Sequence, residues 1–262
     1  MYDPQRKGEA FRSLHAGEPF VIPNPWDAGS ARVLEALGFK AVASTSSGFA
    51  FTRGRLDGDV TLDQVVQHAE ELDRAIGLPV SIDLENGYGR EPERAALAIT
   101  RVAAAGAVGA SIEDNDPTEG LYELAHAAGR IAAAAETAHG LDFPFTLTAR
   151  AENHIRGNPD LDDTIARLQA FEAAGADVLF APGLRTGEEI RRVCGAVSKP
   201  VNVLALRGIS MSEIIDAGAQ RISVGGGLTW IAVNAMADAA RSIFAGDLSV
   251  LESSPPLEDW FG

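Results

Sequence analysis

The chain has 262 residues, of which 46% are hydrophobic and 23% charged, and its formal net charge is −15. This length is enough for one large domain with a sizeable core. So acidic a protein is a poor partner for nucleic acids or anionic membranes, because binding phosphate requires a basic patch. The single cysteine, Cys194, excludes an intramolecular disulfide and fits a reducing compartment. No stretch reaches the ~18 consecutive apolar residues of a membrane span. We expect a cytoplasmic protein.

Short apolar runs recur along the chain, and most are followed by an amphipathic stretch. The runs begin near residues 20, 41, 79, 109, 145, 178, 200 and 221. They are continuous rather than alternating, as in parallel strands covered by helices. The stretches 30–38, 61–77 and 162–177 have apolar residues at helical spacing and end at or near a glycine, which closes a helix at little cost.

Eight strand–helix units in about 250 residues predict a (β/α)8 TIM barrel. A doubly wound open sheet is the alternative. We expect one barrel domain over residues 1–245 and a tail over residues 246–262, which is acidic and interrupted by prolines. This tail contains Trp260 and Phe261, and it either packs on the barrel or a partner subunit or is loosely held.

Polar residues follow the predicted strands, at the end of a barrel where active sites are built. In chain order they are Asp27, the segment 44–48, Asp83, Glu85, Glu113, Asp114, Arg150, Glu152, Asn202 and the segment 223–227. Carboxylates at the ends of apolar strands are costly unless they are paired or bind a cation. The excess of these carboxylates over the single arginine, Arg150, predicts a hard divalent cation such as Mg²⁺ or Mn²⁺. Asp83 and Glu85, two apart on a strand, should face the same side. The alternative is that each acid caps a helix or pairs with an arginine.

Two glycine-containing segments are candidate binding loops. The segment "STSSGFAFTRG" offers hydroxyl and backbone N–H groups in a tight turn, which suits a carboxylate or enolate oxygen. An ordinary strand-to-loop turn is the alternative. The segment "SVGGGLTW" is similar to the phosphate-binding loop that many barrels have after strand eight, although close helix–strand packing explains it equally well.

Several motifs together resemble the isocitrate lyase/phosphoenolpyruvate mutase superfamily. They are "NPWDAGSARVLEALGFKAVASTSSG", "DLENGYG", "SIEDND", "TARAENH", "PVNVLA" and "RISVGGG", which are in register from about residue 10 to 245. The resemblance implies a barrel that is usually tetrameric, with its last helix swapped onto a neighbouring subunit. It also implies Mg²⁺ and a 2-oxo acid, or its enolate, as the shared chemical species.

The resemblance also implies roles for individual residues. Asp83 is similar to the direct Mg²⁺ ligand, while Glu85, Glu113 and Asp57 are similar to acids that hold the ion largely through its waters. Arg150 resembles the arginine that clamps the substrate carboxylate. The remaining positions that match substrate-binding residues are Ser46, Ser47, Gly48, Phe49 and Asn202. We therefore expect a homo-oligomer, a dimer or tetramer, that binds a small 2-oxo acid or dicarboxylate.

The segment after the fourth strand departs from the family pattern. Many lyase members have a "KKCGH"-like loop there, whereas this chain has "EDNDPTEGLYELAHAAGR", without cysteine or a lysine pair. Tyr122, Glu119 or His154 are candidate substitutes, and we take Arg150, Glu113 and Tyr122 as the catalytic set. The metal motif has Glu85 in place of the usual Asp.

The sequence predicts a Mg²⁺-dependent lyase that acts through a pyruvate-like enolate. Cleavage of a C–C bond or decarboxylation is favoured over P–C chemistry, and decarboxylation demands least of the altered loop, since carbon dioxide departs without an acid. The alternative is an oxo-acid-binding protein with a regulatory role and little turnover. A third hypothesis is unrelated barrel chemistry with a phosphate at Gly225 to Gly227.

Overall fold

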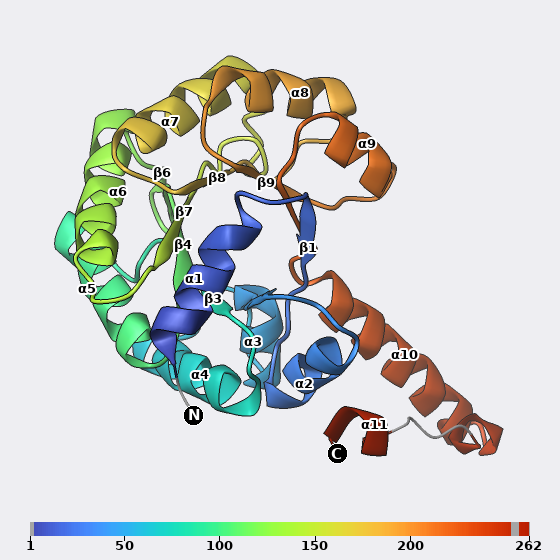
Figure 1. Ribbon diagram of the computed structural model, residues 1–262. Helices are drawn as coiled ribbons and strands as arrows, with labels where there is room; N and C mark the ends of the chain where they lie inside the picture. The colour runs from blue at the N-terminus through green and yellow to red at the C-terminus, as the bar shows by residue number, and fades with distance from the viewer. Residues whose placement is uncertain (1–2, 253–256, 262) are drawn as a thin grey trace.

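Eight parallel strands form a barrel in the computed structural model, which describes residues 3–252 and 257–261 (Figure 1). The strands are β1 (Phe20–Ile22), β2 (Val42–Ala43), β3 (Val80–Asp83), β4 (Gly109–Glu113), β7 (Thr146–Arg150), β8 (Val178–Phe180), β9 (Val201–Leu204) and β10 (Arg221–Ser223). Their order is β1-β10-β9-β8-β7-β4-β3-β2. The N–H of Ala43 donates to the Pro23 carbonyl at 3.1 Å and links the two outer strands. The fold is the predicted TIM barrel and not an open sheet.

A ring of helices covers the outside of the barrel. It consists of α2 (Ala28–Ala36), α4 (Leu62–Ala75), α5 (Pro92–Ala104), α6 (Leu124–His139), α7 (Leu161–Ala173), α8 (Gly187–Ala196) and α9 (Met211–Asp216). The apolar faces of these helices pack on the strands in one continuous core. Helix α1 (Pro4–Leu14) closes the end where the strands begin, because Phe11 packs there against Ile22, Ala41 and Val108. The opposite end is left for the site.

Two local elements differ from the sequence prediction. The segment expected to form a tight glycine turn is instead a helix, α3 (Ser46–Thr52). Gly48 lies inside this helix, and a Cβ there would lie 2.6 Å from the Thr229 hydroxyl, so the glycine is required by close packing. After β4 the chain forms a small antiparallel hairpin, β5 (Asn115–Asp116) and β6 (Gly120–Leu121). Strands of two residues show no periodicity that a sequence pattern can reveal.

Helix α10 (Gly227–Phe244) extends away from the barrel, as Figure 1 shows at the lower right. Among its residues only Thr229 is buried. The turn η1 (Ser249–Leu251) follows, and α11 (Leu257–Phe261) lies against α2, where Arg32 Nη2 donates to the Phe261 carbonyl at 3.3 Å. The described part of the tail therefore returns to its own barrel; residues 253–256 and 262 of the predicted tail lie outside the described residues.

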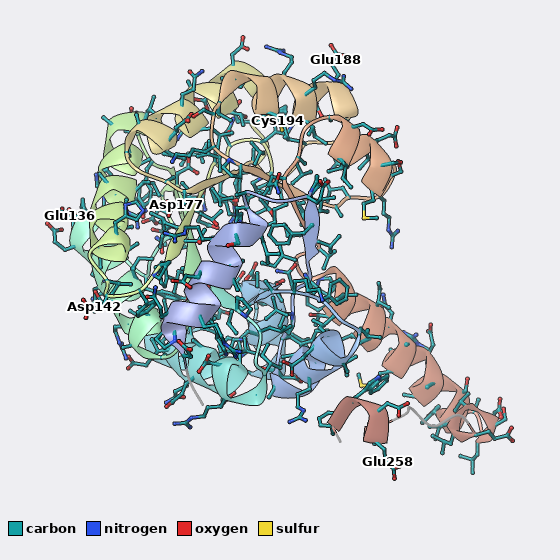
Figure 2. All side chains as sticks on the ribbon, in the orientation of Figure 1. Glu136, Asp142, Asp177, Glu188, Cys194 and Glu258 are labelled. Carbon is teal, nitrogen blue, oxygen red and sulfur yellow. The ribbon has the colours of Figure 1, made fainter. Side chains whose placement is uncertain are left out.

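The outer surface is acidic, as the charge predicts. Glu136, Asp142, Glu188 and Glu258 are exposed on the outside of the molecule (Figure 2). Cys194 is half-buried on α8, and burial raises the pKa of its thiol to about 11, so it is a packing residue and no ready nucleophile. None of the helices in the described ranges has the length and apolar character to cross a membrane.

Candidate active site

Two adjoining cavities open at the carboxyl ends of the strands. The first has a volume of about 180 Å³; its polar lining includes Asn24, Ser44, Ser46, Ser47, Asp57, Asp83, Ser111, Arg150, Asn202, Arg221 and Ser223. The second, of about 230 Å³, shares Ser46, Asp57 and Arg150 with the first and adds Glu85, Asn86, Glu113, Asn115 and Arg156. A larger hollow of about 630 Å³ lies at the opposite end, beside α1, but the predicted strand-end residues do not line it. The two smaller cavities are therefore the candidate site.

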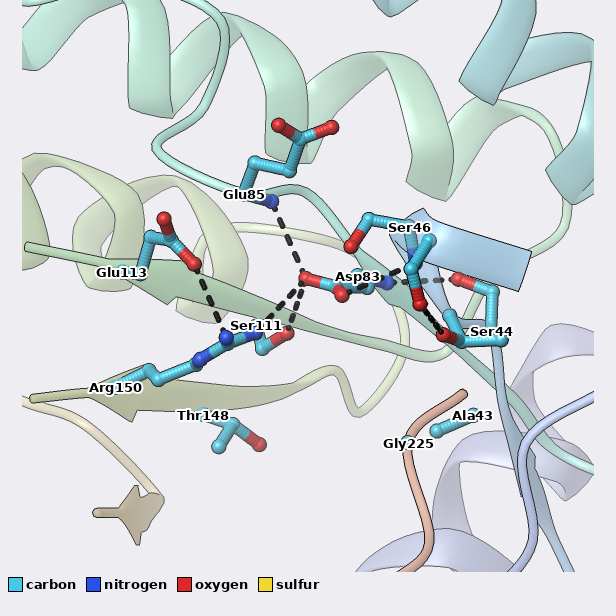
Figure 3. A network of polar contacts seen from close by, with 12 residues as sticks. Ala43, Ser44, Ser46, Asp83, Glu85, Ser111, Glu113, Thr148, Arg150 and Gly225 are labelled. Atoms are coloured by element: carbon cyan, nitrogen blue, oxygen red, sulfur yellow. Dashed lines mark hydrogen bonds and ion pairs between the residues drawn. The ribbon is translucent and has the colours of Figure 1, made fainter. Parts of the chain in front are cut away.

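Asp83 lies at the end of β3 and lines the first cavity, and Figure 3 shows the polar contacts of its carboxylate. One oxygen accepts from the N–H of Ser46 at 3.3 Å, and the other accepts from the N–H of Glu85 and the hydroxyl of Ser111, both at 3.3 Å. The backbone N–H of Asp83 donates to the Ser44 hydroxyl at 2.9 Å. These contacts orient the carboxylate but are long, so its oxygens remain able to bind a further group.

Arg150, at the end of β7, lies among three carboxylates. Its Nε donates to Glu152 Oε1 at 2.5 Å, whereas its terminal nitrogens lie 3.4 Å from Glu113 and 3.5 Å from Asp83. Burial by itself lowers the pKa of Arg150, but the charges of these acids raise it above its usual value. The two terminal nitrogens are at ion-pair distances and not in close hydrogen bonds, which leaves that edge for a ligand carboxylate.

Carboxylates outnumber cations around these cavities. Five acids, Asp57, Asp83, Glu85, Glu113 and Glu152, lie near three arginines, Arg150, Arg156 and Arg221. Burial, together with the charges of Asp83 and Asp57, raises the pKa of Glu85 to about 7. Burial also raises the pKa of Asp57, with the charge of Asp83 adding to the effect. A bound cation would relieve this repulsion.

Glu85 is not on the strand, so the expectation that it faces the same side as Asp83 through strand alternation is wrong. Strand β3 ends at Asp83, and Glu85 has a φ of 49°, in the left-handed region that few non-glycine residues adopt. Tyr88, with a φ of 61°, donates from its hydroxyl to Glu85 Oε1 at 3.1 Å. The turn thereby places Glu85 in the second cavity, while Asp83 lines the first.

The donor set suits a hard cation, although it is not a closed metal cage. Over residues 3–252 and 257–261, no three histidine, cysteine or acidic side chains are grouped closely enough to hold a metal together. All candidate donors are carboxylate oxygens, the ligands that Mg²⁺ prefers, and Mg²⁺ usually keeps several waters. The arrangement therefore fits one direct carboxylate, Asp83, with Glu85, Glu113 and Asp57 reaching the ion through water.

The predicted substrate-binding residues divide into two groups. Ser46 and Ser47 line the first cavity at the start of α3, whose N-cap Thr45 makes no side-chain cap bond. Gly48 and Phe49 are buried behind them and line neither cavity. Asn202 lines the first cavity and donates to the Ser223 hydroxyl at 3.0 Å.

The candidate replacements for the missing cysteine loop do not reach either cavity. Tyr122, predicted as catalytic, is 2% exposed; its hydroxyl donates to Asp116 at 3.2 Å and accepts from Asn86 at 3.0 Å. Glu119 is exposed and pairs with Arg90, and His154 is not among the lining residues. In this structure Tyr122 ties the β5–β6 hairpin to the turn after β3.

Two strand-end acids have structural partners. One caps a helix and the other pairs with an arginine, which was the alternative to a role in the site. Asp27 caps α2 by accepting from the N–H of Ser30 at 2.7 Å. Asp114 accepts from Arg167 Nη1 at 3.0 Å and is 2% exposed. Neither lines the two cavities.

Sequence reasoning missed several lining residues, and Asn24 shows why. Its side-chain oxygen accepts from the N–H groups of Val224 and Gly225 at 2.9 and 2.8 Å, and its amide donates to the carbonyls of Ala43 and Ser44. Asn24 thus joins the ends of β1, β2 and β10 at the mouth of the first cavity. In the sequence, the signal that could have identified Asn24 is its position between two prolines directly after the first strand. Other lining residues that the sequence did not reveal include Ser111, Arg156 and Arg221.

Comparisons with known proteins identify the family of the chain. Residues 11–244 match the family model described as phosphoenolpyruvate phosphomutase. A Burkholderia cenocepacia J2315 protein of solved structure, provisionally named a lyase/mutase, is 46% identical with a TM-score of 0.94, over 98% of this chain and 95% of that one. An oxaloacetate decarboxylase of Bradyrhizobium diazoefficiens is 32% identical over 74% of this chain and 69% of its own length.

A more distant structure, phosphonopyruvate hydrolase in complex with oxalate and Mg²⁺, shares the fold at 21% identity and a TM-score of 0.86, over 97% of this chain and 93% of that one. The family match covers the whole barrel, including each strand end described above. The chain belongs to the phosphoenolpyruvate phosphomutase family, within the isocitrate lyase/phosphoenolpyruvate mutase superfamily, and is an enzyme of this lyase and mutase group.

Proposed function

We propose that the protein is a Mg²⁺-dependent lyase that acts on a small 2-oxo acid or its precursor and cleaves a C–C bond through a pyruvate-like enolate. The observation that supports this most is that Asp83 and the terminal nitrogens of Arg150 line the same cavity. The names of its relatives add support, since one is an oxaloacetate decarboxylase and another structure contains oxalate with Mg²⁺. Oxalate has the planar, doubly charged shape of the enolate of pyruvate.

Each group of residues has its own chemical role in this proposal. Asp83 would hold Mg²⁺ directly, with Glu85, Glu113 and Asp57 placed around its waters. When bound, the ion supplies Lewis-acid stabilisation to the oxygen that becomes negative as the bond breaks. Arg150 binds the substrate carboxylate through its terminal nitrogens, which fixes the oxo acid in the first cavity. The N–H groups at the start of α3 lie on the same wall and can donate to the substrate oxygens.

Two versions of C–C cleavage fit this arrangement. In a decarboxylation, the electrons of the C–C bond move onto the oxo acid as carbon dioxide leaves, and water returns a proton to C3. In a retro-aldol cleavage, a base must also remove a hydroxyl proton. The hairpin β5–β6 and Tyr122 do not supply that base at either cavity, so Asp57, Glu85 and Glu113 are the candidate acid–base groups.

Product analysis tests the proposed function. The protein is incubated with Mg²⁺ and, in turn, oxaloacetate, 2-methylisocitrate, isocitrate and phosphonopyruvate. We expect pyruvate from oxaloacetate or 2-methylisocitrate, or glyoxylate from isocitrate, at a rate well above the protein-free and metal-free controls. If no substrate of the panel yields product, while oxalate still raises the melting temperature in the presence of Mg²⁺, the alternative of a binding protein with little turnover is correct.

The exposed face of α10 supports a second proposal, on assembly. Trp230, Ile231, Met236 and Phe244 are 43%, 67%, 62% and 96% exposed on a helix that leaves the barrel. Several large apolar side chains exposed on one helix are typical of a subunit interface. We propose that α10 packs on a second copy of the chain, as expected for a swapped helix in a dimer or tetramer.

A double substitution tests this assembly. Ile231→Asp with Met236→Asp places two charges in the interface, and we expect the molar mass from light scattering to fall to that of the monomer. Leu56→Asp is the matched control, because Leu56 is 78% exposed on a different face. A single-chain mass for the unaltered protein, or an unchanged mass for the double variant, would remove α10 as the interface.

A further inference from the structure

One cation in the first cavity has no part in the site described so far. Arg221, the first residue of β10, is 5% exposed and lines the first cavity. Its Nε donates to Asn202 Oδ1 at 2.8 Å, Nη2 donates to the Thr148 hydroxyl at 3.0 Å, and Nη1 lies 3.1 Å from His15 Nε2. Two of these acceptors are neutral by nature, and the state of His15 decides whether the third is neutral as well.

The surroundings of His15 make it a neutral acceptor. Its Nδ1 lies 2.9 Å from the Phe11 carbonyl, and Arg221 can only donate, so Nδ1 carries the proton and Nε2 accepts. The ring lies edge-on to Phe11 and Phe20. Burial, and then the charge of Arg221, lowers the pKa of His15 to about 3. His15 therefore positions the guanidinium without neutralising its charge.

Other buried arginines of the chain have partners that account for them. Arg150 and Arg167 each pair with carboxylates, and Arg130 donates to the backbone carbonyls of residues 86, 89, 90 and 113. Within the described part of the chain, by contrast, no carboxylate forms an ion pair with Arg221, and burial alone lowers its pKa to about 9. A buried charge without a counter-ion is costly. Its presence in the wall of a ligand cavity is explained if the ligand brings the counter-ion.

Arg221 also has free donors for such a ligand. A guanidinium has five N–H groups, and three of them are used by Asn202, Thr148 and His15. One N–H remains on each terminal nitrogen, which is the pair that a carboxylate accepts from bidentately.

The location of Arg221 relative to Arg150 is set by β7. Thr148, which Arg221 contacts, is two residues before Arg150 on the same face of that strand (Figure 3). Two residues along a strand span about 7 Å. The two arginines therefore line one cavity at different depths, so a single ligand that contacts both must extend from one to the other.

We propose that Arg221 binds a second carboxylate of the substrate at the inner end of the first cavity, while Arg150 and the acids beside it hold the oxo-acid end. This rests on the proposed function and narrows its substrate to dianionic oxo acids or their precursors. A carboxylate held by an arginine is stabilised in the ground state, which opposes its loss as carbon dioxide. The carboxylate at Arg221 is therefore one that the substrate keeps when the C–C bond breaks.

Matched ligand pairs test the role of Arg221. Calorimetry with Mg²⁺ compares 2-oxoglutarate with 2-oxopentanoate, and oxaloacetate with 2-oxobutanoate; within each pair only the second carboxylate differs. We expect the unaltered protein to bind the diacid of at least one pair roughly 10- to 100-fold more tightly. Arg221→Gln should abolish that preference and leave oxalate binding within a factor of about three. Arg221→Lys should retain part of the preference, and Arg192→Gln, at an exposed arginine, should retain all of it.

The outcomes separate this inference from the proposed function. Equal binding of diacid and monoacid by the unaltered protein overturns the role of Arg221, and this comparison needs no variant to fold. A preference that persists in a folded Arg221→Gln protein, checked by circular dichroism, overturns it as well. In both cases Mg²⁺-dependent oxalate binding would leave the proposed function standing, whereas the absence of binding by oxalate and by all four acids would overturn the proposed function itself.

Discussion

Asp83→Ala is expected to lower kcat/KM for the best substrate of the panel by roughly 10³-fold, because it removes the carboxylate that we propose holds the metal directly. Asp83 also accepts hydrogen bonds from Ser46, Glu85 and Ser111, so the loss combines metal binding with site geometry. Steady-state kinetics over a range of Mg²⁺ concentrations measure the combined loss from metal binding and from site geometry. The defect should persist at Mg²⁺ concentrations that saturate the unaltered enzyme.

Two further variants separate the effect of the metal ligand from an effect on folding. Asp83→Asn keeps the shape and one acceptor oxygen, and we expect it to fold with a melting temperature close to that of the parent but to remain strongly impaired. Asp162→Ala removes a carboxylate that is 85% exposed and distant from the site, and should be neutral. Full activity of Asp83→Asn, with an unchanged dependence on Mg²⁺, would mean that the metal is held elsewhere.

Arg150→Lys is expected to raise the KM for the oxo acid roughly 10- to 100-fold, since a single ammonium cannot form the bidentate contact. The positive charge among Glu113, Glu152 and Asp83 is retained, so the fold should survive. Arg156→Lys is the matched control. Arg156 pairs with Glu113 and Glu152, but its side chain is 48% exposed at the edge of the second cavity. We expect the control to change KM by less than about threefold.

The comparison of the two lysine variants is the deciding result. A large effect at Arg150 with a small effect at Arg156 supports the assignment of the carboxylate site to the first cavity. Similar effects at both positions would indicate that the overall charge of the acid cluster matters more than the clamp. An unchanged KM in Arg150→Lys would place the substrate carboxylate elsewhere.

The barrel could be predicted from the sequence because its signals are local and repeated. Each parallel strand is a short apolar run, and each run begins within about one residue of the strand in the structure. Glycines just after a helix, such as Gly106 and Gly175 with φ of 109° and 102°, indicate that the next strand begins soon after them. These features depend on neighbours along the chain, which a sequence displays directly.

The site was only partly predictable, because its geometry depends on contacts between distant residues. Asp83 and Arg150 could be found, since they end strands. The position of Glu85 follows from a left-handed turn, and the loss of Tyr122 from the site follows from its bonds to Asn86 and Asp116. The charge of Arg221 becomes informative only when three neutral neighbours from β7, β9 and the end of α1 are seen around it. None of these is a pattern along the chain.

Calorimetric titration of oxalate with and without Mg²⁺ tests the central claim most directly, since oxalate resembles the enolate and requires no turnover. We predict binding of oxalate in the micromolar range with Mg²⁺, at about −8 kcal/mol, and binding weakened at least about 100-fold when the metal is removed with EDTA. Equal oxalate affinity in both conditions would contradict a metal-assisted enolate site at Asp83 and Arg150.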